Sequence, residues 1–105
     1  MVFVESSIFR RYAADYLAED ELRGLQLFLA EHPGAGTLVK GSGGLRKLRW
    51  SAAGKGKRGG LRLIYYWQVQ EDQIYLLTLY AKNEVSDLRP AEIAALRKMV
   101  EAWSR

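Results

Sequence analysis

The chain has 105 residues, which is the size of one domain, and 49% of them are hydrophobic, which excludes wholesale disorder. It has no cysteine, which excludes a disulfide scaffold and any thiolate metal site. No apolar run approaches the ~20 residues that span a bilayer, and the N-terminus lacks the pattern of a secretory signal. We therefore expect a single domain, residues 1–105, that is soluble, cytoplasmic and free of membrane contact.

The first third of the chain predicts one strand and two helices. Residues 2–5 are β-branched and aromatic, as in a strand, and Ser6 or Ser7 can cap the helix that follows. The acidic residues 19–21 suit the start of a second helix, because negative charge there favours the helix dipole. Pro33, followed by glycine, ends that helix.

The remainder predicts three strands and a final helix. Apolar and β-branched residues indicate strands at 45–50, 61–69 and 74–82, and the last two are apolar on both faces, as in central strands. A helix beginning near Pro90 has an apolar stripe, interpreted as core, at Ile93, Leu96, Val100 and Trp103. The order β-α-α-β-β-β-α predicts an α+β fold, a small and mostly antiparallel sheet with helices packed on it.

Charge is concentrated in one segment. Residues 32–70 contain no acidic residue, yet they hold eight of the sixteen basic ones, namely Lys40, Arg46, Lys47, Arg49, Lys55, Lys57, Arg58 and Arg62. Such a field attracts a polyanion, although a solvated basic loop is the alternative. Aromatic residues among these cations favour single-stranded RNA, since rings stack on unpaired bases. We assign RNA binding to Arg46, Lys47, Arg49 and Arg58.

Several other motifs are excluded. Residues 54–59 match G-x-G-x-x-G, but they lead into a strand and do not open a helix, so no dinucleotide site is predicted. His32 is the only histidine and lies at a helix end, which argues against a metal site and a Ser-His-Asp triad. We expect no metal and no cofactor. Tyr65 and Tyr66 are interpreted as core residues, whereas Tyr80 shares a face with Lys82, which predicts a polar and accessible setting.

Residues 43–50 (GGLRKLRW), 54–60 (GKGKRGG) and 62–66 (RLIYY) together resemble the RelE/HigB-type toxins of bacterial toxin–antitoxin pairs, most closely the HigB branch. Residues 80–84 and 87–92 continue the resemblance. It implies a microbial RNase-like α+β fold, cleavage of mRNA in the ribosomal A site beside ribosomal RNA, and neutralisation by a cognate helix-turn-helix antitoxin. The family's functional positions fall on Lys55, Lys57, Arg62 and Lys82, whereas Leu88 stands near the place of a tyrosine found in many relatives.

These residues suggest a metal-independent mechanism in which the RNA 2′-OH attacks the adjacent phosphate. Lys55 and Lys57 would supply a partly neutral amine, because crowded cations lower a lysine pKa. Arg62 would clamp the phosphate, Tyr80 would stack on a base or move a proton, and Lys82 would stabilise charge. We therefore expect Lys55, Lys57, Arg62, Tyr80 and Lys82 to be catalytic.

Other functions fit the same sequence. One is a non-catalytic RNA- or ribosome-binding module with the same basic segment. Another is a gyrase-directed toxin of the ParE branch on the same fold, against which the lysine and arginine set argues. A third is an interaction protein whose apolar surface awaits a partner.

Overall fold

The computed structural model describes residues 1–51, 60–82, 84–85 and 87–103 of the chain. In this part of the chain, three helices and five strands form in the order β1 (Val2–Glu5), α1 (Ser7–Tyr16), α2 (Glu19–Glu31), β2 (Thr37–Leu38), β3 (Leu45–Trp50), β4 (Leu61–Gln68), β5 (Gln73–Ala81) and α3 (Pro90–Trp103). Within the described residues, no helix is both long and apolar enough to cross a membrane.

The strands form one sheet in the order β1-β5-β4-β3-β2. β1 pairs with β5 in parallel, and the other pairings are antiparallel, so the predicted fold class is confirmed. β4 and β5 are flanked on both sides, as their apolar faces predicted. The predicted element order lacked β2, whose two residues pair with Lys47 and Arg46 of β3. A strand of two exposed residues is too short to show an alternating pattern in the sequence.

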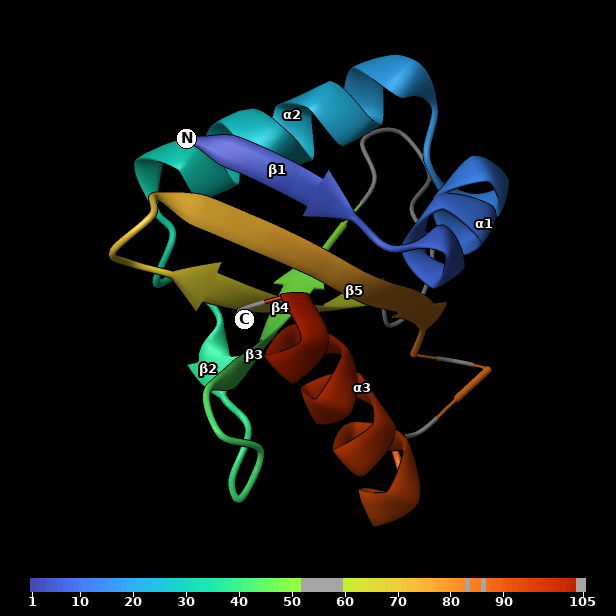
Figure 1. Cartoon of the computed structure of the whole chain (residues 1–105). Helices are drawn as coiled ribbons and strands as arrows, with labels where there is room; N and C mark the ends of the chain where they lie inside the picture. The colour runs from blue at the N-terminus through green and yellow to red at the C-terminus, as the bar shows by residue number, and fades with distance from the viewer. Residues whose placement is uncertain (52–59, 83, 86, 104–105) are drawn as a thin grey trace.

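Helices cover both faces of the sheet. α1 and α2 lie on one face and α3 on the other (Figure 1). The first face buries apolar side chains of β3, β4 and β5 against α1 and α2, among them Leu48, Leu63, Tyr65, Leu76 and Leu79. The second face buries Leu45, Ile64, Tyr75, Leu77 and Tyr80 against Leu96 and Val100. The stripe predicted for the last helix is therefore core.

An irregularity in β5 decides which residues face α3. The pairing of β4 with β5 shifts between Ile64 and Tyr65, so that β5 carries one extra residue there. Tyr75 and Leu77 face α3 on one side of the shift, whereas Tyr80 faces it on the other. The bulge therefore turns Tyr80, and not Leu79, toward the α3 face.

Local signals fix the first helix where the sequence predicted it. Ser6 is the residue that caps α1: its Oγ accepts a hydrogen bond from the Phe9 amide at 2.8 Å. The same hydroxyl donates to the Leu77 carbonyl at 2.7 Å, which ties the start of α1 to the sheet. The cap thus serves both the helix and the packing of the layer.

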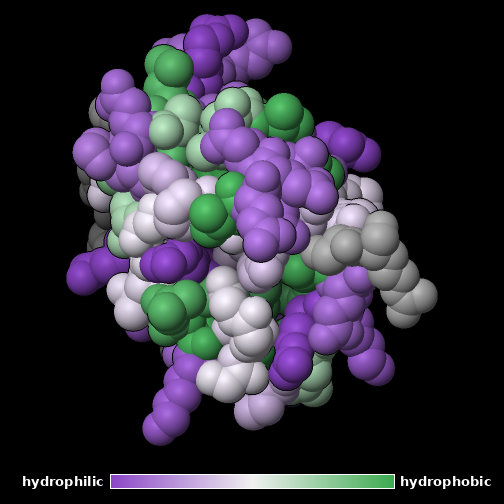
Figure 2. Space-filling view, turned by 60° about the vertical axis from the view of Figure 1, so that its left-hand side comes forward, coloured by the Kyte–Doolittle hydropathy of each residue, from purple (hydrophilic) through white to green (hydrophobic). Residues whose placement is uncertain are grey.

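Exposed apolar residues are scattered. On the face shown in Figure 2, hydrophobic residues form separate patches among hydrophilic ones. The most exposed large apolar side chains come from different elements: Leu27 from α2, Leu38 from β2 and Val69 from the turn after β4. Such isolated residues are normal for a protein surface, and we assign no site to them.

Candidate nucleic-acid interface

Two arginines and a tyrosine form a row across three strands on the α3 face. Arg49 of β3 lies directly opposite Arg62 of β4, and Arg62 lies directly opposite Tyr80 of β5. Directly opposed residues of antiparallel strands project to the same face, with Cβ atoms about 4.5–5.5 Å apart. Lys47, two residues before Arg49, points to that face as well. We call Lys47, Arg49, Arg62 and Tyr80 the cationic row.

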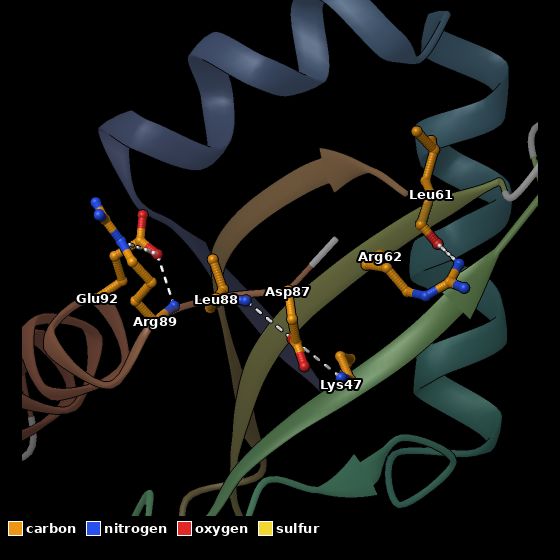
Figure 3. Close-up of polar contacts among 7 residues, drawn as sticks. All are labelled: Lys47, Leu61, Arg62, Asp87, Leu88, Arg89 and Glu92. Carbon is orange, nitrogen blue, oxygen red and sulfur yellow. Dashed lines mark hydrogen bonds and ion pairs between the residues drawn. The ribbon is translucent and has the colours of Figure 1, made fainter. Parts of the chain in front are cut away.

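Arg62 forms the floor of this row. It is only 9% exposed, although its side chain carries a permanent charge. Its Nη1 donates to the carbonyl oxygen of Leu61 at 3.3 Å, and in Figure 3 the guanidinium lies beside that carbonyl, apart from Asp87. A cation held in place at the floor of a sheet is pre-organised to receive an anion.

Asp87 belongs to the connection between β5 and α3, and its side chain contacts the cationic row at Lys47. Its Oδ1 is 3.3 Å from Lys47 Nζ, and the two side chains point toward one another in Figure 3. The same oxygen accepts a hydrogen bond from the Leu88 amide at 2.9 Å. The hydrogen bond from the Leu88 amide is the main cause that lowers the pKa of Asp87. The hydrogen bond and charge of Lys47, with a contribution from the charge of Lys82, lower it further, whereas burial raises it. The carboxylate is therefore ionised at neutral pH.

Tyr80 is buried, and the expected accessible setting is wrong. Its residue is 7% exposed, because α3 packs over this part of the face. Burial is the main reason that the pKa of Tyr80 is raised; the charge of Asp87 raises it further, while Arg62 lowers it. The phenol therefore stays protonated at neutral pH and acts as a hydrogen-bond donor.

The connection that carries Asp87 is anchored at both ends. Tyr16 of α1 donates a hydrogen bond to Glu84, which raises the pKa of Tyr16 to about 12, with burial and the charge of Glu84 adding to the effect. At the other end, the Arg89 amide donates to Glu92 Oε1 at 2.8 Å. Glu92 thus caps the start of α3, where Arg89 stands in place of a hydroxyl residue.

The predicted site residues fall into three groups. Lys47, Arg49, Arg62 and Tyr80 share the α3 face, and Lys82 follows β5 as an exposed residue close enough to affect Asp87. Arg46 faces the opposite side, where its Nη1 donates to the carbonyls of Gly34 at 3.2 Å and Gly36 at 2.8 Å. Lys55, Lys57 and Arg58 lie outside the described residues.

The sequence reasoning assigned no role to Asp87. An aspartate side chain can accept a hydrogen bond from a neighbouring backbone amide, as Asp87 does from Leu88, and the local sequence is compatible with this contact. What the sequence did not reveal is the partner of this carboxylate: Lys47 lies forty residues away in the chain, on another strand.

A small α+β domain with a cationic row on the half-covered face of its sheet is typical of a protein that binds a polyanion. Residues 9–105 match the family model described as the RelE toxin of the RelE/RelB toxin–antitoxin system. The chain therefore belongs to the RelE toxin family, and as such it is a toxin with an antitoxin partner.

The fold agrees with this membership. The chain is similar to a solved structure of a double mutant of E. coli toxin RelE in the free state, with a TM-score of 0.58. The match covers 93% of this chain and 94% of the other at 11% sequence identity, so it shows a common fold. Neither match distinguishes the HigB branch, and that closer resemblance stays a prediction.

Proposed function

We propose that this toxin is a ribosome-dependent mRNA endoribonuclease that inhibits translation. The observation that carries the proposal is the direct opposition of Arg49 and Arg62 across two strands. Like charges placed opposite each other destabilise a sheet, and an anion bound over both offsets that repulsion. An RNA backbone phosphate is such an anion, and membership of the RelE family supports RNA as the ligand.

The reaction we propose needs no metal, because RNA carries its own nucleophile. A general base removes the proton of the 2′-OH as its oxygen attacks the adjacent phosphorus, the bond to the 5′-oxygen breaks to leave a 2′,3′-cyclic phosphate, and a proton passes to the 5′-oxygen. Arg62 would clamp the phosphate with its forked guanidinium, while Lys47 and Arg49 would hold the strand on either side. Lys82, exposed beside them, would add to the stabilisation of charge.

Tyr80 is better suited to donate than to accept a proton. Its raised pKa keeps the phenol protonated at neutral pH. We therefore propose that Tyr80 orients the phosphate or its neighbours by donating a hydrogen bond. Its burial also argues against stacking on a base. We therefore propose that the general base is one of the two lysines predicted for this role, Lys55 or Lys57.

We propose that the toxin needs the ribosome, because phosphate contacts position a strand without reading its sequence. In-line attack requires the 2′-oxygen, the phosphorus and the leaving oxygen to be aligned, and a flexible strand seldom adopts that geometry. A codon held in the ribosomal A site would be presented in one conformation. The cationic row would also hold ribosomal RNA.

Primer extension on one mRNA, translated or naked, tests the proposal. We compare the wild type with Arg62→Gln, which removes the charge of the floor residue, and with Arg97→Gln, which removes an exposed charge on α3. We expect new 5′ ends on translated mRNA only, about 10²–10³-fold fewer with Arg62→Gln, and no change with Arg97→Gln. Circular dichroism verifies that each variant is folded.

Each other outcome points to a different function. Equal cleavage of naked and translated mRNA would remove the ribosome from the mechanism. A salt-sensitive stall without new 5′ ends would indicate an RNA-binding module, and inhibition of DNA supercoiling would indicate a gyrase-directed toxin. Purification together with a small helix-turn-helix protein would identify the antitoxin that we propose as the neutralising partner.

A further inference from the structure

The cationic row already holds an anion of its own chain. Asp87 Oδ1 lies 3.3 Å from Lys47 Nζ and accepts the Leu88 amide hydrogen at 2.9 Å (Figure 3). An ammonium group and a backbone N–H are also the donors that bind a phosphate oxygen in proteins. The carboxylate therefore has, within the fold, contacts of the kind that a substrate phosphate would make.

This carboxylate is held where it is by its surroundings. Leu88, the next residue, packs against the core beneath α3 and fixes the backbone on one side of the aspartate. Glu92 caps the helix that follows, and the hydrogen bond from Tyr16 to Glu84 fastens the beginning of the connection. The pairing with Lys47 is thus a feature of the folded chain.

The contact is nevertheless one that a ligand can break. The Asp87 side chain is 66% exposed and that of Lys47 is 35% exposed, so water already screens the pair. A competing anion reaches both groups without any part of the core having to open. The aspartate can turn outward into solvent when it loses its partner.

We propose that Asp87 is a specificity-determining residue of this site: its carboxylate competes with an RNA backbone phosphate for Lys47, so that RNA binds only by displacing it. This inference rests on the proposed function. A freely diffusing RNA strand competes with the Asp87 carboxylate only at the low concentration that the strand has in solution. A strand fixed by the ribosome beside the docked toxin has a far higher effective concentration and wins.

The size of the effect follows from the exposure of the pair. Partly exposed ion pairs of this kind change an equilibrium by about two- to fivefold when one charge is removed. Asp87→Asn keeps the shape of the side chain and an oxygen that can accept the Leu88 amide hydrogen. It removes the charge, and with it the competition for Lys47 as well as the influence of that charge on Tyr80 and Lys82.

Fluorescence anisotropy with a short single-stranded RNA, made uncleavable by 2′-O-methyl groups, tests the inference on the full chain. We expect Asp87→Asn to bind this RNA about two- to fivefold more tightly than the wild type. Asp20→Asn, which removes the same charge from the first turn of α2, is the matched control and should bind like the wild type. Arg62→Gln should bind more weakly.

The outcomes separate this inference from the proposed function. Unchanged or weaker RNA binding by Asp87→Asn, with Arg62→Gln still impaired, would overturn the competition and leave the RNA site standing. Equal tightening by Asp87→Asn and Asp20→Asn would reduce the effect to net charge and would also overturn it. Identical affinities for the wild type and Arg62→Gln would instead contradict the proposed function itself.

Discussion

The two faces of the sheet are built from the same strands but differ in what they hold. The face under α1 and α2 is lined by buried apolar side chains on β3, β4 and β5. The face under α3 begins in the same way, with Leu45, Ile64 and Leu77, but continues into Arg49, which is exposed, and Arg62. α3 covers the second face, whereas α1 and α2 cover the first (Figure 1).

This difference indicates how a small domain keeps both a core and a charged surface. One face, covered by two helices, supplies most of the apolar burial that stabilises the fold. The other can then present cations whose mutual repulsion opposes folding slightly. Substitutions on the two faces should therefore separate stability from RNA binding.

The largest effect on stability is expected on the face under α1 and α2. Leu63 is 0% exposed in the centre of β4, so Leu63→Ala leaves a cavity and should lower the free energy of unfolding by about 2–5 kcal/mol. Urea unfolding followed by circular dichroism measures this change. Leu27→Ala, at a residue 63% exposed on α2, should stay within about 0.5 kcal/mol of the wild type. Similar losses in both variants would contradict the assignment of the core.

A smaller effect is expected where the two faces are joined. Tyr16 of α1 reaches Glu84 in the connection to α3, and Tyr16→Phe removes that hydrogen bond. The free energy of unfolding should fall by about 0.5–1.5 kcal/mol at neutral pH. Urea titrations of the two proteins give the difference.

The pH dependence of that difference has a definite sign. The folded chain raises the pKa of Tyr16 from 10.0 to about 12, so the folded state holds the phenolic proton more firmly than the unfolded state. The stabilisation is fully present below pH 10 and is lost as the pH rises toward about 12. The gap between wild type and Tyr16→Phe should therefore close over that range. A gap that stays constant would contradict the assigned hydrogen bond.

The smallest effect on stability is expected at the exposed end of the cationic row. Arg49→Gln relieves the repulsion with Arg62 and alters an exposed side chain, so the free energy of unfolding should change by no more than about 0.5 kcal/mol, upward if at all. A clear loss of stability would show that Arg49 stabilises the fold and does not serve only the charged surface.

The sequence allowed much of this architecture to be predicted, because alternation along a strand is a local property. Alternation along β4 puts Arg62, Ile64 and Tyr66 on one face, and in the structure Ile64 and Tyr66 do pack on the α3 face. The same alternation separates Arg46 from Lys47 in β3, and the structure shows that Arg46 binds backbone carbonyls on the opposite face.

The remainder depends on contacts between distant parts of the chain. The setting of Tyr80 was predicted wrongly, since its burial results from α3, which lies later in the chain. The bulge that turns Tyr80 toward α3 is a property of the pairing of β4 with β5. The meeting of Asp87 with Lys47 likewise requires the folded sheet.

The salt dependence of RNA affinity tests the cationic row most directly. Each phosphate contact of a single strand contributes about 0.7 to the slope of log affinity against log salt concentration. We predict that Arg49→Gln and Arg62→Gln each lower the slope by about that amount and that Arg97→Gln leaves it unchanged. Equal slopes in all three variants and the wild type would mean that RNA does not bind at this face.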